Sequence, residues 1–360
     1  MKNRFGPSLY FASDKVIFDS LNQHQVKIEH VRELLFERGI IVSSRTSKEE
    51  LAQYFSRLTA DYFDHDSIAS KLGRVAKKER TTTSELKGSF GDSEILDALN
   101  AVKTMIEKTG NTVDITVKDG KIIALISYEH VDYSKIDLRQ VEPRDALIVF
   151  NKEPDGTFTL RSTQNNEIDA VVDIVVSSLG EKAGKPLERT RISLESMANP
   201  ASRTNFYENL INDIQGFKFI TVTEAYCFRP KTSGVIRDDQ DIDTDVDIEK
   251  LPWVEKIALR GEGVNKSIVI NDLYKSGYYI VKVLWRVQDE KNSNSDIFEL
   301  EAQFSRPDNC TDFSYKVKSV LMVTDGIQTT KRRSAKKEEE ETLFRLIDES
   351  AKRSLLSLVQ

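Results

Sequence analysis

The sequence contains no long apolar run. None of its 360 residues lies in a stretch approaching the roughly 20 consecutive apolar residues that a membrane-spanning helix needs. The N-terminal MKNRFGPSLYFASDK also lacks the apolar core of a signal peptide. With 39% hydrophobic and 31% charged residues, the chain is expected to be globular rather than disordered. We therefore expect no association with a membrane.

Cysteine is scarce as well. Cys227 and Cys310 are the two cysteines of the chain, and each lies inside an apolar run, far from the other in sequence. Two cysteines without a motif argue against a disulfide framework and against a thiolate metal site. This usage is typical of a reducing compartment, and we expect a cytoplasmic protein.

The common motifs of cofactor and catalytic sites are missing. The sequence has no G-x-x-x-x-G-K-[ST] phosphate loop and no G-x-S-x-G nucleophile motif. The four histidines are not spaced as a metal-binding pair, and no thiolate accompanies them: His24, His30, His65 and His130. We therefore expect no cofactor and no metal, and no catalytic residue can be named from the sequence.

An acidic run at 238–249 comes nearest to a metal motif. Asp241, Asp243 and Asp245 match the first three ligand positions of a calcium loop. Val246 replaces the glycine that this loop requires, and Pro252 stands where the final glutamate should be. The calcium interpretation therefore fails, and the run is typical of a solvated loop.

The most informative stretch is 27–58, whose pattern predicts a helix, a short extended arm and a second helix. Apolar residues at three- and four-residue spacing predict an amphipathic first helix. Gly39 stands where a helix C-terminus needs a left-handed residue. Ser47 and Glu50 match a capping box that begins the second helix. The expected apolar face of that helix consists of Leu51, Tyr54, Phe55 and Leu58.

This stretch resembles the helix-extension-helix modules of the SAP, HeH and LEM families. Gly39-Ile40, Val42, Lys48 and Leu51 fall where HeH and LEM motifs carry G-I-x-V, K and L. The arm is about two residues longer than in typical SAP motifs, so the HeH or LEM spacing fits better. The resemblance to SAP and HeH modules implies DNA binding, whereas the resemblance to LEM modules implies binding to a DNA-bridging protein.

The residues around the second helix independently favour contact with phosphate. A helix N-terminus offers free backbone N–H groups and the positive end of the helix dipole. Residues 1–90 carry 15 Lys and Arg against 12 Asp and Glu, a net charge of +3. Because the whole chain has a net charge of −6, the remaining residues carry a net charge of −9. We predict that nine residues contact nucleic acid: Ser43, Ser44, Arg45, Lys48, Lys71, Arg74, Lys77, Lys78 and Arg80.

The remaining sequence predicts an α+β fold. A small all-α head (1–80) is followed by a polar linker (81–93) and then by two units with antiparallel sheets (94–180 and 203–360). Both units show a helix–meander–helix pattern. Helices are expected at 94–108, 167–179, 203–215 and 339–359. Strands are expected at 112–117, 121–131, 146–151, 157–162, 217–228, 254–259, 278–287, 297–304 and 313–323.

Two further groups of residues are open to more than one interpretation. A second basic cluster at 331–337 precedes four glutamates, so it either contacts phosphate or forms a solvated helix entry with internal ion pairs. The aromatic residues of the last strands are more typical of a sheet core than of a base-stacking platform: Trp253, Trp285, Tyr278, Tyr279 and Phe298.

Our leading hypothesis is a non-catalytic DNA-binding or adaptor protein. The head would dock on the nucleic-acid backbone, and the body would recruit a protein partner or self-associate within a multi-protein system. One alternative is a protein-interaction scaffold, which an exposed apolar patch on the head would indicate. The other is an enzyme whose site is not readable as a linear motif, which a pocket gathering several carboxylates, or carboxylates with a lysine, would indicate.

Overall fold

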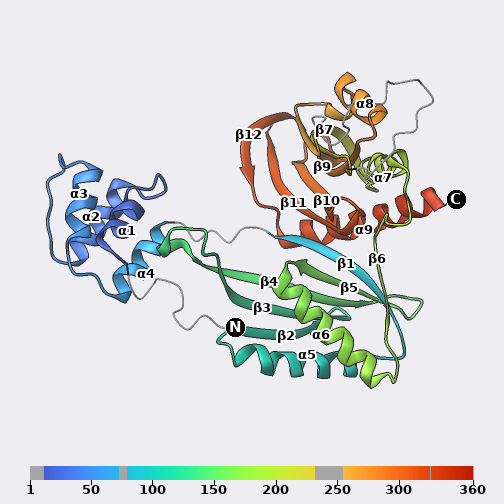
Figure 1. The fold of residues 1–360 in the computed structure, drawn as a ribbon, viewed down its shortest axis with the longest axis horizontal. Coiled ribbons are helices and arrows are strands. Elements are labelled where there is room, and N and C mark those ends of the chain that lie inside the picture. The colour runs from blue at the N-terminus through green and yellow to red at the C-terminus, as the bar shows by residue number, and fades with distance from the viewer. Residues whose placement is uncertain (1–11, 73–78, 232–253, 325, 360) are drawn as a thin grey trace, which may run out of the picture. The chain divides into compact units, whose positions relative to one another are not determined.

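The computed structural model describes residues 12–72, 79–231, 254–324 and 326–359 (Figure 1). Helices and antiparallel strands both contribute, which confirms the predicted α+β class. The backbone contacts divide the chain into two compact units. The first unit comprises 1–78, 96–116 and 123–147, and the second comprises 79–95, 117–122 and 148–360. The expected unit at 94–180 is therefore shared between the two.

Four helices form the N-terminal part of the first unit, which we call the head (12–72; Figure 1). They are α1 (Asp14–Leu21), α2 (Ile28–Glu37), α3 (Lys48–Ser56) and α4 (Tyr62–Lys71). Each places one apolar face in a common core, whose fully buried members include Leu21, Val31, Leu35, Phe55 and Ile68. Leu138 and Val141 complete this core from later in the chain.

Two helices, α2 and α3, lie in the stretch 27–58 as expected, and residues 38–47 between them form neither helix nor strand. Gly39 follows α2 with a φ of 73°, as the C-terminus of a helix requires. The Ser47 hydroxyl accepts from the Glu50 amide, and the Glu50 carboxylate accepts from the Ser47 amide at 2.9 Å. This geometry confirms the predicted capping box. Tyr54, expected on the apolar face of α3, is 48% exposed instead, whereas Leu51 and Phe55 are buried.

The next elements begin with α5 (Asp92–Glu107) and continue with β2 (Thr112–Lys118), β3 (Lys121–Val131), a 3-10 turn η2 (Asp137–Arg139) and β4 (Val141–Lys152). β2, β3 and β4 are successive neighbours in the sheet order. Asp119 and Gly120 join β2 to β3, and both have positive φ values, of 52° and 71°. A two-residue turn of this kind matches the twist of a hairpin, so the predicted turn is confirmed.

The second unit contains most of the sheet. β4 pairs with β5, and the order then continues β5-β1-β11-β10-β9-β7-β8, with β12 beside β11 and β6 beside β1. Its strands are β1 (Arg80–Lys87), β5 (Phe158–Gln164), β6 (Glu188–Arg191), β7 (Phe217–Phe228), β8 (Lys256–Arg260), β9 (Tyr279–Asp289), β10 (Ile297–Arg306), β11 (Thr311–Thr324) and β12 (Ile327–Arg333). Its helices are α6 (Asn166–Lys182), α7 (Pro200–Asn212), η4 (Val264–Lys266), α8 (Ile268–Lys275) and α9 (Lys337–Val359).

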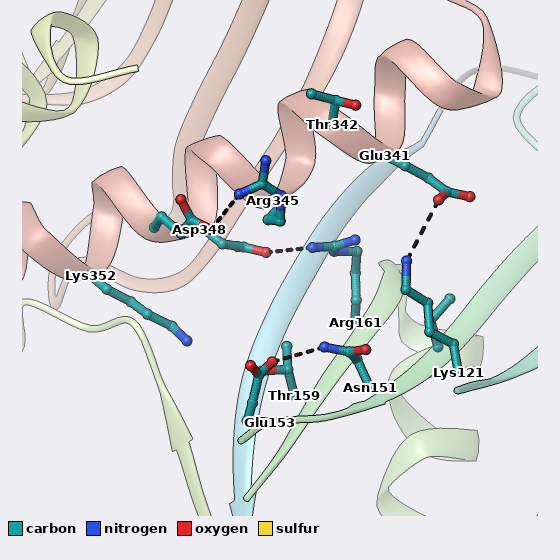
Figure 2. Close-up of a pocket in the computed structure, with 12 residues that line it drawn as sticks. Lys121, Asn151, Glu153, Thr159, Arg161, Glu341, Thr342, Arg345, Asp348 and Lys352 are labelled. Carbon is teal, nitrogen blue, oxygen red and sulfur yellow. Dashed lines mark hydrogen bonds and ion pairs between the residues drawn. The ribbon is translucent and has the colours of Figure 1, made fainter. Parts of the chain in front are cut away.

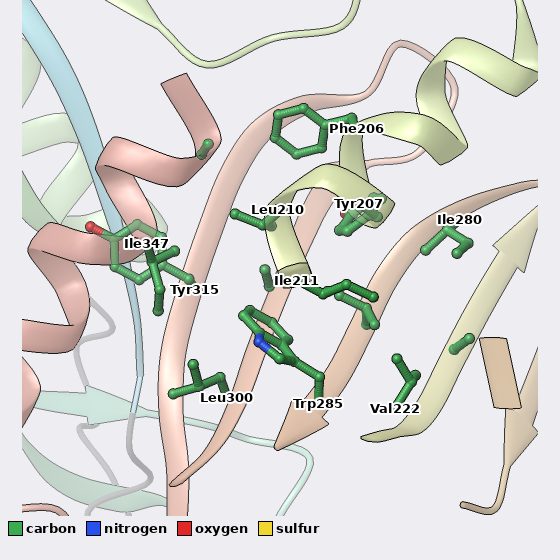
Figure 3. Close-up of a cluster of buried hydrophobic side chains, with 14 of the residues drawn as sticks. Phe206, Tyr207, Leu210, Ile211, Val222, Ile280, Trp285, Leu300, Tyr315 and Ile347 are labelled. Carbon is green, nitrogen blue, oxygen red and sulfur yellow. The ribbon is translucent and has the colours of Figure 1, made fainter. Parts of the chain in front are cut away.

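Helices α7 and α9 pack on one face of β9–β11 and enclose the core of this unit (Figure 3). Trp285 and Tyr315 reach this core from the strands, and Tyr207 and Ile347 reach it from the two helices. Tyr278, Tyr279 and Phe298 are buried in it too, so the predicted sheet-core role of these aromatic residues is confirmed. Trp253 lies outside the described residues. Both cysteines are free and buried, and burial raises the pKa of each thiol to about 12.

The prediction of a linker at 81–93 is wrong. Residues 80–87 form β1, which lies between β5 and β11 near the middle of the sheet. The sequence did not predict this strand because its polar side chains suggested a solvated segment. In the structure they form hydrogen bonds inside the fold. The Thr82 hydroxyl donates to the Phe313 carbonyl at 2.9 Å, and the Thr83 hydroxyl donates to the Asp348 carboxylate at 3.0 Å. The sequence also gave no expectation for β6, β12 or α8.

Candidate functional site

Four of the predicted nucleic-acid contacts gather at the beginning of α3. Ser43, Ser44 and Arg45 are exposed in the turn that precedes the helix, and Lys48 is its first residue. The Ser43 hydroxyl accepts from the Arg45 amide at 3.2 Å. Lys48 is less available than expected, because its ammonium donates to the Gln23 carbonyl at 2.7 Å and burial lowers its pKa. Lys48 therefore ties α3 to the loop before α2.

The other predicted basic residues do not extend this group within the described structure. The Lys71 ammonium is paired with the Glu33 carboxylate, whose pKa the hydrogen bond from Lys71 lowers. Arg74, Lys77 and Lys78 lie outside the described residues. The head carries eight Lys and Arg against ten Asp and Glu, a net charge of −2. The described head (12–72) therefore does not carry the positive net charge that was counted over residues 1–90.

The head does expose large apolar side chains. Ile41 in the extended arm is 87% exposed, Phe63 in α4 is 78% exposed and Phe36 in α2 is 69% exposed. An ion pair between Arg38 and Asp64 joins the end of α2 to the first turn of α4. Phe36 and Phe63 lie within two positions of that ion pair along the chain. Apolar side chains that gather into one exposed patch mark surfaces that meet a protein partner, and the ion pair brings together the helix ends that carry Phe36 and Phe63.

Arg80, the last of the nine predicted contacts, belongs to the second unit and leads to a different charged surface. Its guanidinium donates to the Glu301 carboxylate at 2.8 Å. Along β10, Phe298, Leu300, Ala302 and Phe304 point into the core that α7 and α9 cover. Because alternate residues of a strand point to opposite faces, Glu299 and Glu301 lie on the other face of the sheet. Ion pairs surround both glutamates there.

Each buried glutamate is shared by three cations. Glu301 lies within 3.7 Å of the charged nitrogens of Arg80, Lys282 and Lys316. Glu299 lies within 3.8 Å of those of Arg286, Lys318 and Arg332. Glu224 lies 3.7 Å from both Lys318 and Arg260, and Glu262 lies 2.8 Å from Arg286. We call these eleven residues the charged sheet face.

The charged sheet face has a positive excess. Its seven cations stand against four carboxylates, a net charge of +3. Burial alone would raise the pKa of Glu301, but Arg80, Lys316 and Lys282 hold it below its ordinary value. Glu299 and Glu301 are buried, whereas the side chains of Lys318, Arg332 and Arg260 are 37–71% exposed. The exposed charges of this face are therefore three cations and one carboxylate, Glu262, whose side chain is 74% exposed.

The structure places neighbouring residues of the second basic cluster (331–337) on opposite sides of a strand. Arg332 on β12 belongs to the charged sheet face, where it donates to Glu299 at 2.9 Å. Arg333, the next residue, points to the other side and pairs with Asp296 and Glu339. Sequence proximity suggested one patch, but the alternation of a strand separates the two side chains. Ion pairing at the entry of α9 is thus found for Arg333, whereas contact of this cluster with phosphate stays a prediction.

A polar pocket of about 330 Å³ lies between the strands and α9 (Figure 2). Its strand side consists of Lys121, Val149, Asn151, Glu153, Thr159 and Arg161. Its helix side consists of Glu341, Thr342, Arg345, Asp348, Glu349 and Lys352. Val149 is the one apolar residue among them. The helix residues recur every three or four positions, a polar stripe beside the buried Leu343 and Ile347 that the sequence alone could have shown.

An ion pair between Arg161 and Asp348 crosses the pocket at 3.0 Å (Figure 2). Asp348 is 5% exposed, and burial raises its pKa although Arg161 opposes this. One oxygen of Asp348 accepts from Thr83 and Arg161. Within the described residues its other oxygen, Oδ1, has no hydrogen-bond partner, and neither has Nε of Arg161. Both atoms are closed to solvent, so they lie beneath the pocket surface and not on it.

The described residues contain no helix long and apolar enough to cross a membrane, and no group of three His, Cys, Asp or Glu residues placed to hold a metal ion. Comparison with known proteins finds no family model that matches the chain and no curated protein that is similar to it. The surfaces described above are therefore the basis for a functional proposal.

Proposed function

We propose that this protein is a nucleic-acid-binding adaptor that holds the phosphate backbone on its charged sheet face. The observation that supports the proposal is the excess of seven cations over four carboxylates on one face of one sheet. These cations project from β1, β8, β9, β11 and β12, so neighbouring strands hold them in a fixed array. Backbone contacts of this kind give affinity without sequence information.

The buried glutamates also have a part in this proposal. Glu299 and Glu301 hold the inner ends of the cation array in place, so fewer side chains have to be ordered when a phosphate binds. The excess of three positive charges then sets the salt dependence. Neutralising about three phosphates releases counterions and gives a slope of roughly −3 for the logarithm of the binding constant against that of the salt concentration.

The adaptor part of the proposal rests on the head. Its exposed Phe36, Ile41 and Phe63 favour a protein partner, and the resemblance to LEM modules implies one as well. Its described charges are net negative, which does not favour phosphate. In this proposal the head recruits a protein and the second unit contacts nucleic acid.

The test is fluorescence anisotropy of the full chain with labelled duplex DNA at 50 and 200 mM salt. We expect affinity to fall with salt, by about 60-fold for a slope of −3. The double variant Lys318→Gln/Arg332→Gln removes two exposed cations of the charged sheet face. It should weaken binding at least tenfold at low salt, equally for unrelated sequences, and should lessen the salt slope by about two.

The matched control is Lys185→Gln/Lys275→Gln, which changes the net charge equally at two exposed positions outside the charged sheet face. It should bind within twofold of the unmodified protein. The proposal is wrong if the unmodified chain does not bind at low salt, or if both double variants weaken binding to the same extent.

A further inference from the structure

Two ion pairs hold helices α2 and α4 of the head side by side (Figure 1). Arg38 pairs with Asp64, and Glu33 pairs with Lys71. Residue numbers fall along α2 and rise along α4 from the first pair to the second, so the two helices are antiparallel. The end of α2 therefore lies beside the beginning of α4, and both ends carry exposed aromatic side chains.

Phe36 and Phe63 point away from the core of the head. The buried residues of the two helices are Val31, Leu34 and Leu35 on α2, and His65, Ile68 and Ala69 on α4. Because an α-helix turns by about 100° per residue, each phenylalanine lies on the side of its helix opposite these buried residues. The Tyr62 ring packs edge-on against the Phe63 ring, with 5.7 Å between the centroids, and Tyr62 is itself 40% exposed. We call Phe36, Tyr62 and Phe63 the aromatic patch of the head.

The charges on α2 and α4 around the aromatic patch are mainly negative. Residues 28–38 and 61–71 carry six Asp and Glu against three Lys and Arg, a net charge of −3. All three cations are already bonded: Arg38 and Lys71 in the two ion pairs, and Arg32 to the Ser44 carbonyl at 2.7 Å.

Two carboxylates of α2 stand open beside these bonded cations. Glu29 and Glu37 are exposed, and neither forms an ion pair with another described residue. Like charges in the partner would be repelled there, whereas Lys or Arg side chains would gain from both carboxylates. The surface therefore favours a partner that joins apolar groups to positive charge.

The backbone of that partner must satisfy its own hydrogen bonds. The main-chain groups of α2 and α4 are used within the helices, so the patch offers no strand edge to which an extended segment could add. A segment that covers exposed rings loses water from its peptide groups, and an α-helix satisfies these groups internally. Apolar residues at three- and four-residue spacing then form one stripe that can cover rings on two neighbouring helices.

We propose that the aromatic patch receives a basic amphipathic helix of the protein that the head recruits in the proposed function, on which this assignment rests. The apolar stripe of the partner helix packs on Phe36 and Phe63. Lys and Arg residues beside the stripe pair with Glu29 and Glu37.

The test is fluorescence anisotropy of the full chain with a labelled Leu/Lys peptide of about 18 residues, five helical turns long, whose leucines form one helical stripe. We expect a dissociation constant below about 50 µM at about 150 mM salt. One control peptide has Glu in place of every Lys, and the other has the same composition in an order that forms no stripe. Both should bind at least tenfold more weakly. No binding of the Leu/Lys peptide, or equal binding of either control peptide, overturns the proposal.

Variants locate the peptide on the patch. Phe36→Ser/Phe63→Ser changes two exposed positions and should weaken peptide binding at least tenfold, whereas Ile268→Ser, at a position 79% exposed on α8, should not change it. Glu29→Gln/Glu37→Gln should weaken binding three- to tenfold. Its matched control, Glu255→Gln/Glu290→Gln, removes two exposed carboxylates of the second unit and should bind within twofold of the unmodified protein. Equal losses in a pair and its control overturn the assignment to the aromatic patch.

Duplex DNA titrated against the same variants separates this assignment from nucleic-acid binding. Phe36→Ser/Phe63→Ser should bind DNA within twofold of the unmodified protein, because the charged sheet face is unchanged. A chain that binds DNA but not the Leu/Lys peptide overturns the assignment of the patch alone. A chain that binds the peptide through Phe36 and Phe63 but not DNA supports the assignment and overturns the nucleic-acid part of the proposed function.

Discussion

Glu301 is the residue on which the inner part of the charged sheet face depends. Its buried carboxylate lies among Arg80, Lys282 and Lys316. We expect Glu301→Gln to lower the free energy of unfolding by about 3 kcal/mol at pH 7, because three partly buried cations lose their counter-charge. Urea unfolding measures this loss. The exposed Glu255→Gln, which removes a surface pair with Lys256, should cost less than about 0.5 kcal/mol.

The pH dependence distinguishes the charge of Glu301 from its shape. The cations hold the pKa of Glu301 below its ordinary value in the folded protein. A carboxyl with a lowered pKa stabilises the fold above its unfolded-state pKa, and this stabilisation is lost as the pH falls through the folded-state pKa. The difference between the unmodified protein and Glu301→Gln should therefore stay constant from pH 8 to pH 5 and shrink below pH 4. A difference that does not change with pH would show that packing, not charge, is responsible.

Among the elements, α9 joins the core of the second unit to the pocket. Ile347 is fully buried against the sheet, whereas Leu356 on the same helix is exposed. We expect Ile347→Ala to lower the free energy of unfolding by about 3 kcal/mol, through lost burial and the cavity left behind. Leu356→Ala is the matched control and should change it by less than about 0.5 kcal/mol. Urea unfolding followed by the fluorescence of the buried Trp285 reports on this core. Equal losses in both variants would contradict the packing described for α9.

The elements that the sequence predicted best are those specified by local patterns. β7 occupies 217–228 as expected, and the Asp119-Gly120 turn gave the hairpin of β2 and β3. The capping box at Ser47 likewise depends on residues three positions apart. β1 was missed because its Thr residues look solvated in the sequence, and the partners of Thr82 and Thr83 come from more than 200 positions away. A pattern read along the chain contains no information about such partners.

At the scale of the whole molecule, the order of the strands in the sheet determines which residues come together in each candidate site. The charged sheet face collects residues from 80 to 332, and the pocket collects residues from 121 to 352. Neither has a linear motif, because antiparallel pairing brings distant strands side by side. The sequence did point to two participants, Arg80 and Arg332, but assigned Arg80 to the N-terminal basic stretch and Arg332 to the cluster at 331–337. The neighbours of Arg80 on the sheet could not be identified without the pairing of β1 with β11.

The whole chain carries a net charge of −6, so a nucleic acid must bind where the local charge is positive. Among the described residues, the exposed Arg45 before α3 and the charged sheet face both present positive charge. We expect Arg45→Ala in the full chain to change the affinity for duplex DNA by less than twofold, because the described head is net negative and Lys48 is already bound to a carbonyl. Lys318→Gln/Arg332→Gln should lower it at least tenfold in the same anisotropy assay. The reverse ranking would place the phosphate contact on the head, as the resemblance to SAP and HeH modules implies, and would leave the charged sheet face as a stabilising ion network.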